Sequence, residues 1–325
     1  MTNRPTRLRR NTTIRQMVKE TRLTMEQIIY PIFLVEGNHI KEEISSLKDQ
    51  YHYSIDVLVS ELPNFKKLGI KSLLLFASTS HKSMDGSSGS QEDGLVQSAI
   101  KAIKEEDPTF YVIADVCLCQ YKEDGHCCIY KENKEIDRMA TLNVLSDIAL
   151  SYAKAGVDMV APSDMMDGRV GAIRQKLDQN GYEYVAIMAY SAKYASSFYG
   201  PFREAAHSAP AFGDRKSYQM DPANRTEALK EILLDVEEGA DVIMVKPAMP
   251  YLDIISDAKQ SVTVPVAAYQ VSGEYAMLMQ AIEAGIVDER AIYESLITIC
   301  RSGASIIISY FAKEIARILE KEANL

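Results

Sequence analysis

Short apolar runs recur along the chain, and most of them follow a glycine by two or three residues. The segments before these glycines carry apolar residues at helical spacing, which predicts helices that end at a glycine such as Gly156 or Gly303. The runs themselves are short and almost uniformly apolar, which is typical of parallel strands buried on both faces. The pattern occurs in residues 66–78, 153–164, 178–193, 237–247 and 301–311.

Three further apolar runs, at 28–36, 110–120 and 264–271, bring the expected strands to eight. Eight βα units in about 300 residues predict an α/β fold, a (β/α)8 TIM barrel. An open doubly wound sheet is the alternative, but no G-x-G-x-x-G follows the first strand. No linker divides the chain, so we expect an N-terminal arm over 1–27 and a single catalytic barrel over 28–325. The arm either packs on another subunit or is a frayed tail.

Composition and charge narrow the class of protein. The chain has 325 residues, of which 47% are hydrophobic and 25% charged, enough for a full core. The net charge of −9 and the single short basic run argue against nucleic-acid binding. No secretion signal and no run of 18 apolar residues is present, so we expect no membrane span and a cytoplasmic protein with reduced thiols.

Chemically active residues follow the expected strands. A (β/α)8 barrel carries its catalytic groups at the C-terminal ends of its strands. We therefore expect these side chains to surround one barrel mouth. They are Ser78, Ser80, Cys117, Cys119, Ser163, Asp164, Lys193, Lys246, Gln270, Ser272 and Tyr310.

Four of the five cysteines lie in the segment "DVCLCQYKEDGHCC". On a strand, Cys117 and Cys119 would point to the same face, and Cys127 returns after a loop. Three thiolates suit zinc and leave one coordination position open, as catalytic zinc sites do. His126 or Cys128 is a candidate fourth ligand. The alternatives are buried cysteines without a metal, or a disulfide, which a reducing compartment disfavours.

Lys193 and Lys246 each end an apolar run. Burial and a neighbouring cation lower the pKa of a lysine, which leaves a neutral amine that can form a Schiff base with a carbonyl substrate. The alternative is an ion pair with a carboxylate. Between the lysines, residues 196–225 are rich in Gly, Pro, aromatic and basic residues. Such a long connection predicts a lid whose arginines hold a substrate carboxylate, unless it is only a solvated loop.

Several long motifs then point to one family. The chain resembles porphobilinogen synthase (5-aminolevulinate dehydratase), in its zinc-dependent branch, over nearly its whole length. This resemblance implies a (β/α)8 barrel that condenses two 5-aminolevulinate molecules to porphobilinogen, with loss of two waters, in tetrapyrrole biosynthesis such as that of haem. The motifs are "DVCLCQYKEDGHC", "VAPSDMMDGRVGAIR", "MAYSAKYASSFYGPFREA", "GDRKSYQMDPANR", "IMVKPAMPYLDI" and "VSGEYAML".

Matched motif by motif, the resemblance also implies roles for individual residues. Lys246 would form a Schiff base with the first substrate molecule and Lys193 with the second. Cys117, Cys119 and Cys127 would hold a zinc ion that acts as a Lewis acid.

The remaining roles concern the substrate carboxylates and proton transfer. The resemblance implies that Arg203 and Arg215 grip the carboxylate of the second substrate. Ser272 and Tyr310 would bind the carboxylate of the first. Asp115 would carry protons near the metal and the lysines.

The chain departs from the family pattern at two positions. Cys128 stands where the family commonly has glycine, and Asp124 where some members have histidine. Glu231 matches a residue that holds an activating magnesium ion in some members, although it is equally an ordinary exposed helix carboxylate. The N-terminal extension resembles the arm that wraps a neighbouring barrel in the family's homo-octamers.

Two other function classes remain open from the residues. A Schiff-base aldolase on the same barrel would need one essential lysine and no metal. A zinc-binding or thiol-storage module would use the cysteines alone. Neither gives a role to both lysines and the basic lid.

Overall fold

A closed barrel of parallel strands forms the body of the computed structural model, which describes residues 3–206 and 208–323. Eight of the described strands pair in the order β1-β4-β5-β6-β7-β8-β9-β10, and β10 pairs back with β1. The predicted (β/α)8 barrel is therefore confirmed. The strands are β1 (Ile28–Leu34), β4 (Ser72–Ala77), β5 (Tyr111–Val116), β6 (Met159–Pro162), β7 (Ala186–Lys193), β8 (Val242–Lys246), β9 (Val266–Gln270) and β10 (Ile306–Ser309).

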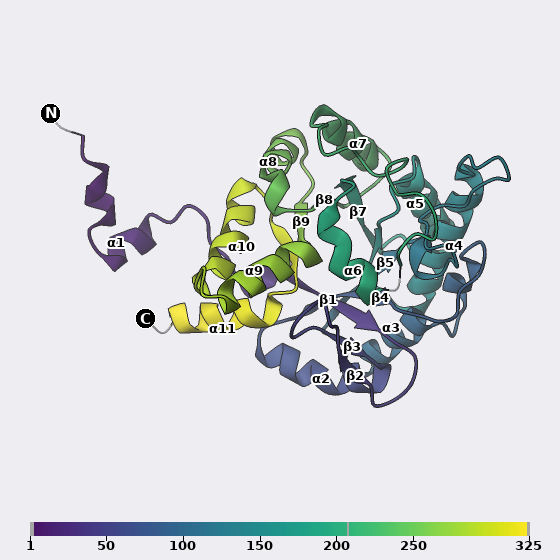
Figure 1. Ribbon diagram of the computed structural model, residues 1–325, viewed down its shortest axis with the longest axis horizontal. Helices are drawn as coiled ribbons and strands as arrows, with labels where there is room; N and C mark the ends of the chain where they lie inside the picture. The colour runs from purple at the N-terminus through teal and green to yellow at the C-terminus, as the bar shows by residue number, and fades with distance from the viewer. Residues whose placement is uncertain (1–2, 207, 324–325) are drawn as a thin grey trace.

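Helices surround the barrel (Figure 1). Several end where the glycine pattern predicts, because a glycine accepts the positive φ that stops a helix. Gly156 has φ 98° after α4, and Gly303 has φ 124° after α10. The helices of the ring are α2 (Ile55–Lys67), α3 (Leu95–Glu106), α4 (Arg138–Ala155), α5 (Arg169–Gln179), α7 (Thr226–Glu237), α8 (Leu252–Ser261), α10 (Arg290–Ser302) and α11 (Ala312–Ala323).

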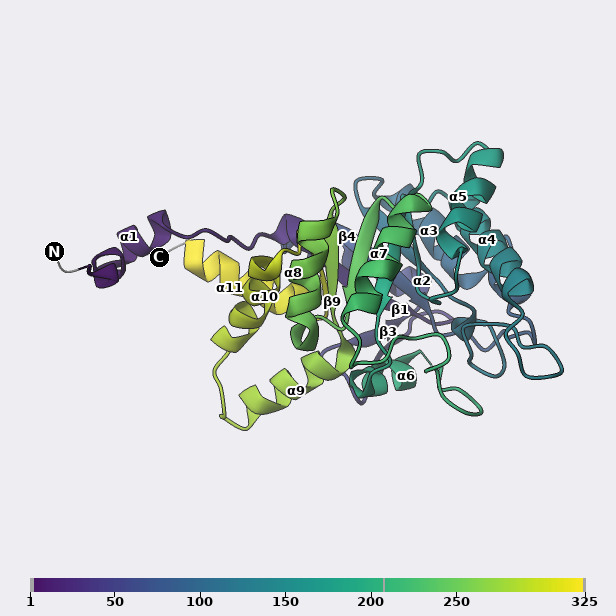
Figure 2. The ribbon, with the colours of Figure 1, turned by 90° about the horizontal axis from the view of Figure 1, so that it is seen from above.

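Two additional helices lie at the end of the barrel where the strands finish. They are α6 (Gly200–Ala205), after β7, and α9 (Ser272–Glu283), after β9. Figures 1 and 2 together show both helices at the same end of the barrel. Both therefore lie beside the strand ends that carry the predicted site.

A small hairpin that the sequence pattern does not predict follows β1. It consists of β2 (Lys41–Glu43) and β3 (Tyr51–Tyr53), and β3 extends the sheet beside β1. All three residues of β2 are exposed. Strands this short and polar carry no alternation of buried and exposed residues, which explains why the pattern misses them.

The N-terminal segment lies apart from the barrel. It contains a short 3-10 helix, Pro5–Arg9, and α1 (Thr12–Met17), and neither buries a residue. Figures 1 and 2 show this segment extending away from the body. Among the described residues, no helix is both long enough and apolar enough to cross a membrane.

Candidate active site

Lys193 and Lys246 lie side by side at the ends of β7 and β8, where they are register partners. Each is only 5% exposed. The Lys193 ammonium donates a hydrogen bond to the backbone carbonyl of Ser163. The Nζ of Lys246 lies 4.2 Å from the ring centre of Tyr269 and 4.9 Å from that of Tyr190. Two amines thus share one buried, aromatic-walled region, as the strand-end pattern predicts.

The surroundings of Lys246 favour its neutral form. Burial, followed by the positive charge of Lys193, lowers the pKa of Lys246 to about 7. About half of the molecules therefore carry a neutral, nucleophilic amine at this position at neutral pH. Tyr199 and Phe202 add two further rings around the same nitrogen, at 5.4 and 5.1 Å.

Asp115 is the next-to-last residue of β5 and is 3% exposed. Its Oδ2 accepts hydrogen bonds from Gln120 Nε2 at 2.7 Å and Ser163 Oγ at 3.1 Å. Burial raises the pKa of Asp115 to about 6, although the two lysine ammoniums favour its charged form. Asp115 Oδ1 and the Tyr190 hydroxyl form no hydrogen bond of good geometry among the described residues, although the two side chains interact with each other. A carboxyl group with this pKa can both donate and accept a proton near neutral pH.

The thiols of Cys117, Cys119 and Cys127 converge. Their sulfur atoms lie within 4.8 Å of one another, and all three residues are buried. The route differs from the predicted one, because β5 ends at Val116 and Cys119 lies in a 3-10 turn, not on the strand. The neighbouring thiols hold the pKa of Cys127 well below its usual range. Three convergent sulfur donors, one of them readily ionised, fit zinc.

Neither candidate fourth ligand belongs to this cluster within the described part of the chain. The His126 ring lies instead 3.1 Å from the Tyr218 hydroxyl through Nδ1 and 2.9 Å from the carbonyl oxygen of Phe212 through Nε2. Cys128 is buried as a free thiol. Asp124 supplies loop hydrogen bonds, since its Oδ1 accepts from the backbone N–H of His126 at 2.9 Å.

The connection after β7 covers the strand ends, as expected for a lid. Its first part holds α6, which Figures 1 and 2 show across one end of the barrel. Its second part contacts the cysteine loop, because the backbone N–H of Ala211 donates to the Asp124 carbonyl at 2.8 Å. Arg215 also donates to the carbonyl of Gly125 at 2.8 Å. The lid and the cysteine loop are therefore joined through several backbone groups.

Arg203 and Arg215 approach each other within this lid. Burial, followed by the positive charge of Arg215, lowers the pKa of Arg203, so the two guanidinium groups are within electrostatic range of each other. The Nε of each is buried and has no hydrogen-bond partner in the described chain. Two adjacent cations with unused N–H donors form a receptor for an anion such as a carboxylate.

Ser272 and Tyr310 lie on the Lys246 side of the site. Ser272 Oγ accepts a hydrogen bond from the backbone N–H of Phe202 at 3.0 Å and lies 3.3 Å from the Phe198 carbonyl. Tyr310 OH lies 3.2 Å from the hydroxyl of Tyr269, whose ring contacts the Lys246 ammonium. Ser272 and Tyr310 thus each contact a residue whose ring lies near the Lys246 ammonium.

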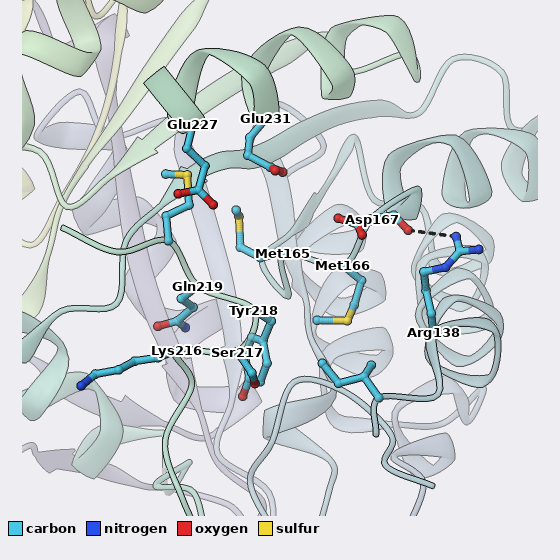
Figure 3. Close-up of a pocket in the computed structure, with 12 residues that line it drawn as sticks. Arg138, Met165, Met166, Asp167, Lys216, Ser217, Tyr218, Gln219, Glu227 and Glu231 are labelled. Atoms are coloured by element: carbon cyan, nitrogen blue, oxygen red, sulfur yellow. Dashed lines mark hydrogen bonds between the residues drawn. The ribbon is translucent and has the colours of Figure 1, made fainter. Parts of the chain in front are cut away.

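Glu231 lies away from the lysines, in a cavity of about 290 Å³. Figure 3 shows Glu227 and Glu231 projecting into this cavity from α7, with Asp167 on the other side. Arg138 donates to the backbone carbonyl of Asp167 at 3.4 Å. Burial raises the pKa of Glu231, and nearby acidic groups add to the effect. The described carboxylates there form no close three-ligand group.

Sequence reasoning missed Tyr190, Tyr269 and Gln120. Tyr190 and Tyr269 lie inside apolar strands, where an aromatic residue is ordinary core, and Gln120 lies in a 3-10 turn where the sequence pattern predicts the end of a strand. The position of Tyr190 three residues before Lys193 was the available signal, because it lies on the same strand near the reactive end.

Comparison with known proteins agrees with this geometry. The family model described as delta-aminolevulinic acid dehydratase matches residues 2–318. A delta-aminolevulinic acid dehydratase from Methanothermus sociabilis is 54% identical over 95% of this chain and 96% of its own length. The protein of that name from Bacillus subtilis is 48% identical over 98% of both chains.

A solved structure is similar over the same extent. It is delta-aminolevulinic acid dehydratase (porphobilinogen synthase) from Toxoplasma gondii, in complex with the reaction product porphobilinogen. Its TM-score is 0.95 and its identity 41%, over 98% of this chain and 92% of that one.

Proposed function

Since the chain belongs to the delta-aminolevulinic acid dehydratase family, also called porphobilinogen synthase, we propose that it condenses two molecules of 5-aminolevulinate to porphobilinogen and two waters. This is a lyase reaction of tetrapyrrole biosynthesis. The observation that carries the proposal is the pairing of two buried lysines, Lys193 and Lys246, beside a buried carboxyl group. Two keto acids need two amines and two carboxylate anchors.

Lys246 is proposed to hold the first substrate. Its neutral amine attacks the keto carbon, and the carbonyl oxygen leaves as water to give an imine. The low pKa of Lys246 supports this role. Ser272 and Tyr310 are proposed to bind the carboxylate of this molecule, since both lie on the Lys246 side.

Lys193 is proposed to form the second imine, and Arg203 and Arg215 to bind the carboxylate of the second molecule. The unused guanidinium N–H groups support this assignment. Asp115 is proposed to exchange protons with both amines, since both lysines are close enough to affect its pKa, and that pKa of about 6 suits a proton carrier. The Tyr190 hydroxyl, which interacts with Asp115, is proposed to contact a polar group of the substrate.

Cys117, Cys119 and Cys127 are proposed to hold zinc, which their convergent sulfur atoms suit. When bound, such an ion supplies Lewis acidity to an oxygen ligand. Asp124 and the lid contacts of the loop hold its backbone in place.

Glu231 is proposed as a separate, weaker magnesium site. Magnesium retains several waters and needs only one or two carboxylates, so the cavity with Glu227 and Asp167 offers suitable charge without a full ligand cage. Residues 1–27 are proposed to be an arm that packs on another copy in a homo-octamer, which would cover the exposed helix Thr12–Met17.

The test is porphobilinogen formation from 5-aminolevulinate by the reduced protein, as isolated, after chelation, and after zinc is restored. We expect product that disappears on chelation and returns with zinc. Product that is indifferent to chelation would retain the reaction and remove the metal role of the cysteines. No product with any metal would overturn the proposal and favour an aldolase or a binding module.

A further inference from the structure

Glu274 is a buried acid that the proposed chemistry does not use. It lies in the first turn of α9 and is 1% exposed. Its Oε1 accepts a hydrogen bond from the backbone N–H of Met249 at 2.5 Å. Its Oε2 accepts from the N–H of Val271 at 2.5 Å and of Ala248 at 3.4 Å. One carboxylate therefore joins the loop after β8 to the start of α9.

The loop that Glu274 holds begins at Lys246. Ala248 and Met249 are the second and third residues after this lysine, beyond Pro247. The Lys246 ammonium is also close enough to favour the charged form of Glu274, although burial raises the pKa of Glu274 to about 7. The carboxylate thus acts on the backbone immediately after the reactive side chain, without lying in the site.

The same turn of α9 also holds the lid. The neighbouring Ser272 bonds to the backbone of Phe202, and Gly273 packs directly against Phe198. A Cβ atom on Gly273 would lie 2.5 Å from the Phe198 carbonyl oxygen, so only glycine allows this approach. The first turn of α9 is therefore the junction between the Lys246 loop and the lid.

Capping of α9 accounts for only one of these bonds. Glu274 is the third residue of the helix, and its bond to the N–H of Val271 is the usual capping bond of a glutamate at that position. The bonds to Ala248 and Met249 lie outside the helix, and they compensate the cost of burying the carboxylate while joining the helix to another loop. Hydrogen bonds to a charged carboxylate are stronger than bonds between neutral groups. Those of Glu274 therefore hold the loop after β8 firmly against the start of α9.

We propose that Glu274 is a positioning residue for Lys246, which it holds at the angle and depth required for attack on the keto carbon of the first substrate. This inference rests on the proposed function. Lys193 ends a different strand, β7, and its neighbouring backbone makes no described bond to Glu274. The two lysines should therefore respond differently when Glu274 changes.

The experiment compares Glu274→Gln with Glu314→Gln in the full-length, zinc-loaded protein. Glu314 is a matched control, because burial also raises its pKa, but it lies on α11 in a cavity shared with α2. Each protein is incubated with 5-aminolevulinate and reduced with borohydride. Mass mapping of peptides then measures adduct formation on Lys246 and Lys193 separately, alongside kcat, KM and the midpoint of thermal unfolding.

We expect Glu274→Gln to slow adduct formation on Lys246 by about 10- to 100-fold, the effect of a misplacement near 1 Å. Adduct formation on Lys193 should change less than about 2-fold. Glu314→Gln should alter neither. Equal slowing at both lysines, or none, would overturn the inference. If Glu274→Gln does not fold, Glu274→Asp, which keeps the charge on a shorter chain, must show the same selectivity for Lys246.

The wild-type protein separates this inference from the proposed function. If the wild-type protein makes no porphobilinogen and forms no borohydride-trapped adduct on Lys246, the proposed function itself is refuted. A wild type that does both, with a Glu274 variant that behaves identically, refutes only the positioning role.

Discussion

Replacing Lys193 by Met is expected to raise the pKa of Lys246. In the wild type, burial and the charge of Lys193 together lower the pKa of Lys246 to about 7. The Nζ atoms of Lys193 and Lys246 lie 5.6 and 4.9 Å from the centre of the Tyr190 ring, and we take about 7 Å as the separation of the two charges. At an effective dielectric constant near 20, the repulsion is about 2.4 kcal/mol, which corresponds to a pKa change of about 1.7.

The pKa of Lys246, which is the midpoint of its titration, should therefore rise from about 7 to between about 8 and 9. Only the neutral amine attacks a carbonyl, so the rate of adduct formation rises with pH through this midpoint. For a shift of about 1.7, the neutral fraction at pH 7 should fall from about half to about 2%. The variant should still react at alkaline pH, because Lys246 remains buried and burial alone keeps its pKa below that of an exposed lysine.

Borohydride trapping of 5-aminolevulinate across a pH series, with mass mapping of the Lys246 peptide, measures this midpoint. The assay follows the adduct because the variant lacks the second amine and should release no porphobilinogen. Lys313→Met serves as the control, since burial also lowers the pKa of Lys313 but this lysine bonds to Asp49 on another side of the barrel. A folded Lys193→Met protein whose midpoint stays near 7, or falls, would refute the electrostatic coupling.

Four further outcomes are expected. Asp115→Asn should lower kcat by about 10²- to 10⁴-fold in steady-state porphobilinogen assays, the usual contribution of a proton carrier; a change confined to KM would contradict that role. Arg203→Gln should raise KM about 10- to 100-fold through loss of a charge-assisted bond, and an unchanged KM would remove Arg203 from the carboxylate site. Cys127→Ser should lose bound zinc in elemental analysis whereas Cys128→Ser should retain it; equal loss would mean that the triad is wrongly assigned. Chelation should speed tryptic cleavage after Arg215, because this part of the lid bonds to the cysteine loop, and equal cleavage rates would show that the two segments are independent.

The barrel itself was predictable because its signals are local. Parallel strands buried on both faces produce uninterrupted apolar runs, and β4, β8 and β10 each follow a helix that ends at a glycine. The hairpin of β2 and β3 was not predictable, since an exposed three-residue strand depends on its partner. The neighbouring positions of Lys193 and Lys246 were predictable as well, because barrel enzymes carry their catalytic residues at the C-terminal ends of the strands.

The details of the site depended on tertiary structure. The three cysteines converge as expected, but through a 3-10 turn that places Cys119 off the strand. The sequence makes His126 a candidate fourth ligand of the metal. In the folded protein its ring contacts Tyr218 and Phe212 of the lid instead. Glu274 showed no functional signal, because its significance lies in bonds to a loop more than twenty residues earlier in the chain.

The sequence by itself determined which chemical groups the barrel presents and on which strands, because strand order and side-chain identity are encoded locally. Only the tertiary structure decided their protonation and their spacing. The pKa of Lys246 depends on burial and on the charge of Lys193, and that of Asp115 on burial and on both lysines. These groups are distant along the chain, and closure of the barrel is what brings them within electrostatic range.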